Sequence, residues 1–176
     1  MGWDFVELFP GENKAEYLHR QFSPWAVIAG GYGVDHSNEY YLAVKAGPGE
    51  PVIGVAILLQ ILDGKFGYKD MDENCGPCIS HAPRKVLQVL DPTSNEIALI
   101  WRSRCETYLE RRKVVKDNFK TGAIVETNPL AWRNVGTFTR LRVVDAKRRH
   151  VRGIFPDGTE STLLRVSLGD LIRNVV

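Results

Sequence analysis

The sequence predicts an α+β fold, in which an antiparallel sheet packed with about three helices is followed by a small β-rich, barrel-like module. Short strand-like runs follow one another through tight turns, as in an antiparallel meander and unlike alternating strands and crossover helices. A long amphipathic pattern then separates these runs from a second set of short strands. We therefore expect two domains, residues 1–115 and residues 119–176, with the second packed on the first.

A capping box marks the first helix. Asn13 is followed three residues later by Glu16, and such a pair satisfies amide groups that are left free at the start of a helix. Apolar residues recur at helical spacing as far as Phe22. The predicted helix spans Asn13 to Phe22, and Pro24 follows its end.

Apolar runs between turn residues predict the strands of the first domain, at residues 25–33, 40–44 and 52–62 and from residue 66 onwards. Asp63-Gly64 is expected to form a tight hairpin turn, because both residue types tolerate a positive φ. Residues 70–83 are rich in Asp, Asn, Gly and Pro, and we interpret them as a loop.

Two further helices are predicted, a short one from Pro83 to Leu90 and a long one that reaches about Lys113. The apolar face of the long helix is expected to consist of Ile97, Trp101, Cys105, Tyr108 and Leu109. Short strands follow from Gly122, with turns at residues 128–129, 145–147 and 156–158.

The composition is that of a folded protein. The chain has 176 residues, of which 44 % are hydrophobic and 25 % are charged, so it can bury a core and is not expected to be disordered. No apolar run is long enough to span a bilayer. The first residues lack the features of a signal peptide, and the odd count of three cysteines argues against a disulfide framework, so we expect a cytoplasmic protein without membrane contact.

Charge is distributed unevenly along the chain. Residues 1–115 carry 12 Lys/Arg and 15 Asp/Glu, or −3, whereas residues 116–176 carry 11 and 6, or +5. An anionic partner is therefore expected to contact the C-terminal third, either as nucleic acid or as an acidic protein surface.

A basic hairpin is predicted within residues 137–155. If Asp145-Ala146-Lys147 is a three-residue loop, then Val144 faces Arg148, Arg142 faces His150 and Arg140 faces Arg152. Alternation along the strands would place the basic side chains on one face, namely Arg140, Arg142, Arg148, His150 and Arg152. Guanidinium groups gathered in this way suit phosphate or carboxylate. In the alternative interpretation this face is merely solvated, with the arginines paired to Glu160 or to acids of the first domain, and a slip of one residue would scatter the cluster.

An acidic segment offers a second candidate site. Its members are Tyr68, Lys69, Asp70, Asp72 and Glu73. Three carboxylates can hold a hard cation such as Mg²⁺, as in a metal-dependent enzyme, although an acidic surface turn has the same composition.

The cysteines offer a third candidate. Cys75, Cys78, His81 and Cys105 would complete a tetrahedral Zn²⁺ site of three thiolates and one imidazole. In the alternative interpretation Cys105 is a small apolar residue of the long helix. The sequence contains no phosphate-binding glycine loop and no hydrolase or zinc-protease motif, so no cofactor is expected besides these two metals.

Several segments together resemble a family of uncharacterised proteins from bacterial genomes, phages and conjugative elements. The resemblance rests on Met1-Gly2-Trp3, on residues 67–73 with Gly76-Pro77-Cys78, on Pro83 before a short helix, and on Trp101-Arg102. It implies a cytoplasmic accessory protein of a mobile element and supplies no activity.

The favoured hypothesis is a non-enzymatic adaptor that binds nucleic acid or an acidic protein surface through the hairpin. The alternatives are a metal-dependent enzyme that uses Asp70, Asp72 and Glu73, and a protein inhibitor of a host nucleic-acid enzyme.

Overall fold

The computed structural model describes residues 3–34, 36–76, 81–127, 138–166 and 171–175. The chain forms two compact units, Met1–Thr107 and Tyr108–Val176, and each contains its own five-stranded antiparallel sheet. With three α-helices among the described residues, the predicted α+β fold class is confirmed.

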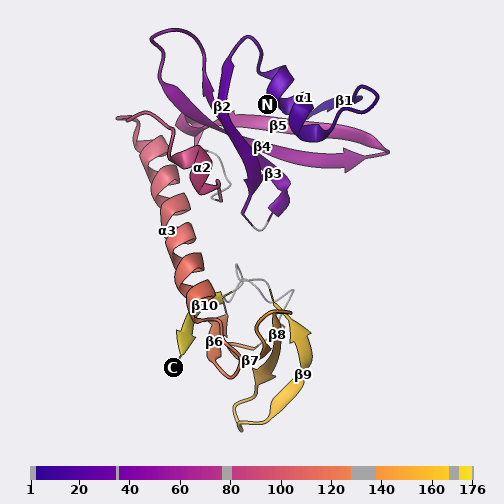
Figure 1. Cartoon of the computed structure of the whole chain (residues 1–176), viewed down its shortest axis with the longest axis vertical. Helices are drawn as coiled ribbons and strands as arrows, with labels where there is room; N and C mark the ends of the chain where they lie inside the picture. The colour runs from indigo at the N-terminus through magenta and orange to yellow at the C-terminus, as the bar shows by residue number, and fades with distance from the viewer. Residues whose placement is uncertain (1–2, 35, 77–80, 128–137, 167–170, 176) are drawn as a thin grey trace. The chain divides into compact units, whose positions relative to one another are not determined.

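The first sheet has the strand order β1-β5-β4-β3-β2 (Figure 1). Its strands are β1 (Asp4–Val6), β2 (Ala26–Gly33), β3 (His36–Lys45), β4 (Val52–Leu62) and β5 (Lys65–Asp72). The turn between β4 and β5 has φ values of 51° at Asp63 and 75° at Gly64, as the Asp-Gly pair predicts. The loop expected from residue 70 begins later, because Asp70 and Asp72 pair with β4 and extend β5. A short 3₁₀ helix, η1 (Glu73–Cys75), follows.

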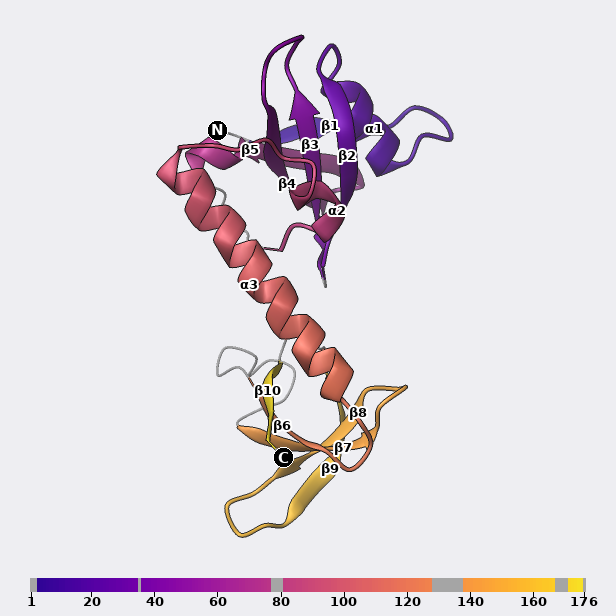
Figure 2. The same ribbon diagram turned by 60° about the vertical axis from the view of Figure 1, so that its left-hand side comes forward.

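A helix covers each face of this sheet (Figures 1 and 2). On one face, α1 (Lys14–Gln21) buries Tyr17 and Leu18, and the capping box of Asn13 and Glu16 is present as predicted. On the other face, α2 (Arg84–Leu87) and the first half of α3 (Glu96–Asn118) pack against β3 and β4. The sheet of the first unit is thus enclosed on both sides.

The apolar face of α3 differs from the predicted one at its first turn. Ile97 is 48 % exposed, and Ala98 is buried in its place. The buried stripe continues through Trp101, Cys105 and Tyr108, with the three- and four-residue spacing of one helix face. The predicted face was therefore wrong at Ile97 alone, because periodicity does not fix which neighbouring residue meets the sheet.

The boundary between the two compact units lies inside α3. The reason is that Val115, near the end of the helix, and Phe119, directly after it, belong to the core of the second unit. That core also contains Val125, Leu141 and Val151.

The second sheet has the order β10-β6-β7-β8-β9. Its strands are β6 (Ile124–Thr127), β7 (Arg140–Asp145), β8 (His150–Ile154), β9 (Glu160–Arg165) and β10 (Leu171–Val175). Four strands form a meander and β10 returns to pair with β6. Within the described residues β9 and β10 remain edges, so the expected barrel-like module is an open sheet. One face of this sheet holds the core, and the opposite face is available to solvent.

Candidate functional site

The hairpin β7–β8 has one apolar and one basic face, as strand alternation predicts. Leu141, Val143 and Val151 are at most 1 % exposed, whereas Arg140, Arg142 and Arg152 are exposed on the other side of the same strands. We refer to the side that carries these three arginines as the outer face of the second sheet.

The predicted pairing across the hairpin was wrong by two residues. Arg142 faces Arg152 and not His150, and Asp145 pairs with His150 after a bulge that follows Val143. The turn contains four residues, 146–149, and closes with Arg149 at a φ of 57°. Because a shift of two residues preserves the alternation, the strand arginines stay on the expected face.

Glu160 neutralises part of the outer face. Arg142 Nε donates a hydrogen bond of 2.6 Å to Glu160 Oε1, and Arg152 Nη1 lies 3.7 Å from Glu160 Oε2. One carboxylate from β9 therefore serves both guanidinium groups, as the alternative interpretation anticipated. All three side chains are partly exposed, so the cluster is hydrated and open to a competing anion.

The turn of the hairpin carries three consecutive exposed cations, Lys147, Arg148 and Arg149. We call these residues the basic tip. Arg148 was predicted on the strand face but lies in the turn, where its backbone N–H donates to Asp145 Oδ1 at 3.0 Å. That hydrogen bond lowers the pKa of the Asp145 carboxyl group, and the Arg148 side chain approaches the same carboxylate at 3.9 Å.

A further cation reaches the tip from β9. Arg165 is exposed and pairs with His150 in the sheet register. Across the parts of the chain that the structure describes, no ion pair is found for Lys147, Arg149 or Arg165. Arg165 was not predicted from the sequence, because its place beside the tip depends on the pairing of β9 with β8.

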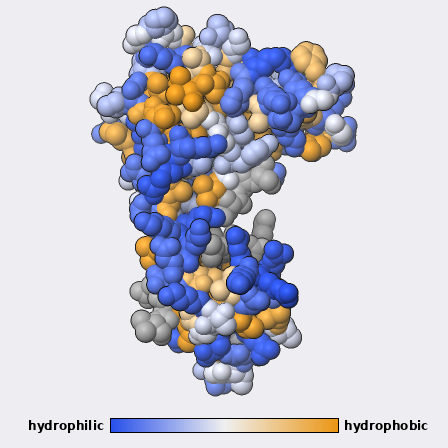
Figure 3. Space-filling view, in the orientation of Figure 1, coloured by the Kyte–Doolittle hydropathy of each residue, from blue (hydrophilic) through white to orange (hydrophobic). Residues whose placement is uncertain are grey.

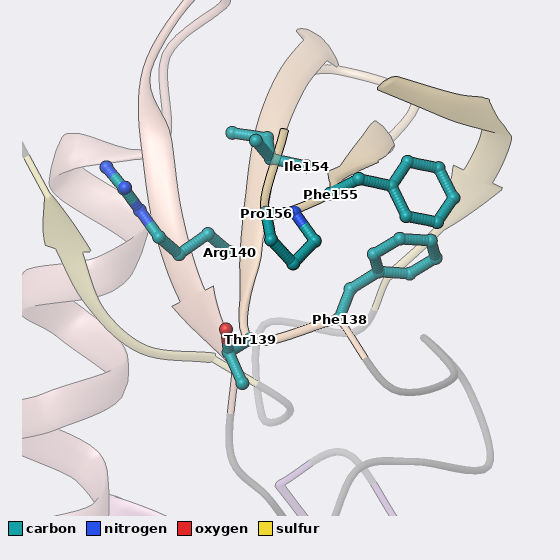
Figure 4. Close-up of a pocket in the computed structure, with 6 residues that line it drawn as sticks. All are labelled: Phe138, Thr139, Arg140, Ile154, Phe155 and Pro156. Atoms are coloured by element: carbon teal, nitrogen blue, oxygen red, sulfur yellow. The ribbon is translucent and has the colours of Figure 1, made fainter. Parts of the chain in front are cut away.

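A pocket of about 310 Å³ lies at the opposite end of the hairpin (Figure 4). Its lining consists of Phe138, Thr139, Arg140, Ile154, Phe155 and Pro156. The rings of Phe138 and Phe155 meet edge to face with their centroids 5.0 Å apart. In Figure 4 the Arg140 side chain extends away from these rings.

Backbone contacts and one glycine shape this pocket. Thr127 Oγ1 donates to the Phe138 carbonyl at 2.6 Å, and Phe155 N donates to the Thr159 carbonyl at 2.9 Å. A Cβ atom at Gly153 would overlap the ring of Phe138, so only glycine lets this ring lie on the strand. This aromatic pair was not predicted from the sequence, although both phenylalanines lie at the open end of the predicted hairpin.

The acidic segment does not form a site of converging carboxylates. Tyr68 and Lys69 belong to strand β5, where Tyr68 is buried and its ring lies 5.9 Å from that of Tyr17. Burial raises the pKa of Tyr68 to about 12. Asp72 Oδ1 accepts hydrogen bonds from the backbone amides of Asn74 and Cys75, and thereby caps η1.

Asp70 and Asp72 lie on β5, whereas Glu73 begins η1 and its side chain is buried. It is 1 % exposed, and its carboxylate accepts two hydrogen bonds of 2.7 Å from Arg102 and one of 3.0 Å from the amide of Gly54. Arg102 also donates to the Asp91 carbonyl. Glu73 thus forms a buried, fully hydrogen-bonded ion pair with Arg102, which links the sheet to α3.

The predicted zinc ligands are not assembled among the described residues, and Cys78 lies outside them. Cys75 is exposed near the start of α3, where a Cβ at Gly76 would touch Ile97. Cys105 is buried two helical turns further along, about 12 Å at the usual helical rise. Burial raises the pKa of its thiol to about 11, so Cys105 is a neutral core residue. His81 contributes backbone hydrogen bonds to Val34 and Tyr41.

The two units differ strongly in charge. Residues 108–176 contain 14 Lys/Arg and 7 Asp/Glu, or +7, which leaves −5 for residues 1–107. In Figure 3 the surface over β8 and β9 is largely hydrophilic, with apolar residues between the polar ones. Leu163 and Phe155 are exposed apolar residues of the second unit.

Comparison of the chain with protein families, curated proteins and solved structures found no match. In the part of the chain that the structure describes, every helix is too short or too polar to cross a membrane.

Proposed function

We propose that the second unit is a non-enzymatic nucleic-acid-binding module whose contact surface is the basic tip together with the outer face of the sheet. The observation that carries this proposal is the basic tip beside Arg165, whose cations are exposed and, among the described residues, form one ion pair, that of Arg148 with Asp145. Like charges held this close repel one another, and a polyanion relieves that repulsion. Phosphates also release counter-ions on binding, which supplies affinity without sequence specificity.

The strand arginines support the same surface. Arg142 and Arg152 are held by Glu160, so their guanidinium groups are already oriented toward one side of the sheet. A phosphate can replace the carboxylate as their partner, because both present oxygen pairs to the guanidinium fork. Arg140 extends this row to the pocket end of the hairpin.

A metal-dependent enzyme is not supported by the geometry of the acidic segment, since Glu73 is engaged by Arg102 and Asp72 caps η1. The expectation of a cytoplasmic accessory protein of a bacterial or phage mobile element rests on the resemblance and stays a prediction. An inhibitor of a host nucleic-acid enzyme, whose acidic residues would imitate phosphate, also stays a prediction. An acidic protein surface is the remaining alternative partner for the basic tip.

The proposal is tested by fluorescence anisotropy of labelled DNA and RNA oligonucleotides, titrated with the full chain over a series of KCl concentrations. We expect binding at low salt with a negative slope of log affinity against log salt. Lys147→Glu/Arg148→Glu is expected to weaken binding at least about tenfold and to reduce the magnitude of the slope by about two.

The matched control is Lys65→Glu/Lys85→Glu, which changes the net charge equally at two exposed lysines of the first unit. It should leave the affinity almost unchanged. The proposal fails if no oligonucleotide binds at low salt, or if both double variants weaken binding equally. Binding of polyglutamate in preference to oligonucleotides would identify an acidic protein surface as the partner.

A further inference from the structure

We infer that the pocket at the open end of the hairpin accepts an unpaired base, so that the module prefers single-stranded nucleic acid to duplex. This inference rests on the proposed function and specifies its ligand class. Single-strand sites combine cations that follow the backbone with aromatic faces on which bases stack. Both kinds of residue line this pocket, namely Arg140 and the rings of Phe138 and Phe155 (Figure 4).

Only one ring of the aromatic pair is open to solvent, because Phe138 packs against the core of the second unit. Phe155 is 43 % exposed, and it lies next to Pro156 in the turn that leads to β9. Phe138 supports it edge to face from below, which leaves a face of the Phe155 ring without a packing partner among the described aromatic residues.

The backbone around the pair is fixed. Phe138 is held through its carbonyl by Thr127, and Gly153 allows its ring to lie flat on β8. Phe155 is held through its amide by Thr159, whose own amide and hydroxyl donate to Asp157. The platform is therefore organised before a ligand arrives, which lowers the entropic cost of binding.

Charge complementarity identifies the occupant. The pocket is lined by apolar rings and by Arg140, and the same hairpin carries Arg142, Arg152 and the basic tip. A ligand that matches this pattern has negative charges at regular intervals and flat apolar groups between them. Single-stranded DNA or RNA has this chemistry, whereas a duplex hides its base faces in the stack.

The test compares the binding of a labelled single-stranded oligonucleotide and of its duplex to the full chain and to Phe155→Ala. We expect the wild-type protein to prefer the single strand. Phe155→Ala should weaken single-strand binding about tenfold, in line with the loss of one stacked base, and should leave duplex binding and the salt slope unchanged. Phe155→Trp should restore single-strand binding, because the indole also offers a stacking face.

Phe9→Ala is the matched control, since Phe9 is a still more exposed phenylalanine, at 61 %, in the first unit. It should bind like the wild type. This inference is overturned if the wild-type protein binds single strand and duplex with equal affinity. It is also overturned if Phe155→Ala weakens single-strand and duplex binding equally, or weakens neither. In each of these cases, salt-dependent binding would still support the proposed function. Absence of any binding at low salt overturns both.

Discussion

The guanidinium of Arg142 on β7 reaches the carboxylate of Glu160 on β9, with 2.6 Å between Nε and Oε1, although strand β8 lies between them in the sheet. Arg152 on that intervening strand approaches the other carboxylate oxygen. Glu160 is therefore the internal competitor of any anion that binds the outer face.

Replacing Glu160 with glutamine should strengthen nucleic-acid binding. The amide keeps an oxygen that can accept from Arg142, but the negative charge that opposes phosphate is lost. We expect an affinity gain of about threefold to tenfold at low salt that shrinks as salt is added. The measurement is anisotropy at two KCl concentrations. Asp63→Asn is the control, because it makes the same charge change in the first unit and asparagine tolerates the left-handed conformation found there. Weaker binding by Glu160→Gln would contradict this view of Glu160.

Arg149→Gly should remove one positive charge from the basic tip without destabilising the turn. Arg149 has a φ of 57°, a conformation that glycine adopts without steric cost. We expect the thermal midpoint to be unchanged or higher, while affinity for nucleic acid falls. Lys147→Gly, where φ is not positive, should lower the midpoint because glycine only adds freedom to the unfolded chain. Thermal unfolding followed by circular dichroism distinguishes the two variants, and equal losses of stability would be inconsistent with a strained Arg149.

Glu73→Gln should destabilise the first unit severely. It leaves the guanidinium of Arg102 without a charged partner at a site where the carboxylate is 1 % exposed, and breaking such a pair costs about 3–5 kcal/mol. Urea denaturation followed by tryptophan fluorescence reports the change, since Trp101 is buried in the same unit. Glu12→Gln breaks an equally well-formed pair with Arg20 that is open to solvent, and its midpoint should stay near the wild type. Similar midpoints for both variants would refute the structural importance of Glu73.

Alkaline pH should destabilise the first unit through Cys105. The thiol has a folded pKa of about 11, raised by burial from an ordinary value of 9.0. Because the pKa of Cys105 is higher in the folded than in the unfolded chain, the neutral thiol contributes fully to the free energy of unfolding below pH 9. This contribution, up to about 3 kcal/mol, is lost as the pH rises toward 11. Cys105→Ala should flatten the dependence of the urea midpoint on pH between 9 and 10, before Tyr68 titrates. An unchanged dependence in Cys105→Ala would assign the alkaline loss to other groups.

Local signals in the sequence predicted most of the elements. The capping box at Asn13, the Asp63-Gly64 turn and the alternation of Leu141 and Arg142 depend on neighbouring residues, and the structure contains all three. The loop expected from residue 70 was wrong in its first residues, because pairing with β4 overrides the low strand propensity of Asp70 and Asp72.

The candidate site was harder to predict from the sequence, because it depends on the register in which neighbouring strands pair. The pairing of Arg142 with Arg152 follows from a four-residue turn and a bulge. No residue type in the hairpin predicts either of these features. Arg102 lies 29 residues from Glu73 in the chain, so their ion pair required knowledge of where α3 packs. The meeting of Phe138 with Phe155 likewise follows from the final hairpin pairing.

Gly153 has a consequence for how the second unit tolerates sequence change. Any other residue at this position places a Cβ where the ring of Phe138 lies, so the ring must leave the strand and the aromatic end of the pocket is rebuilt. In a library of random variants selected for oligonucleotide retention, position 153 should therefore accept almost no replacement, even though its own atoms would never touch the ligand.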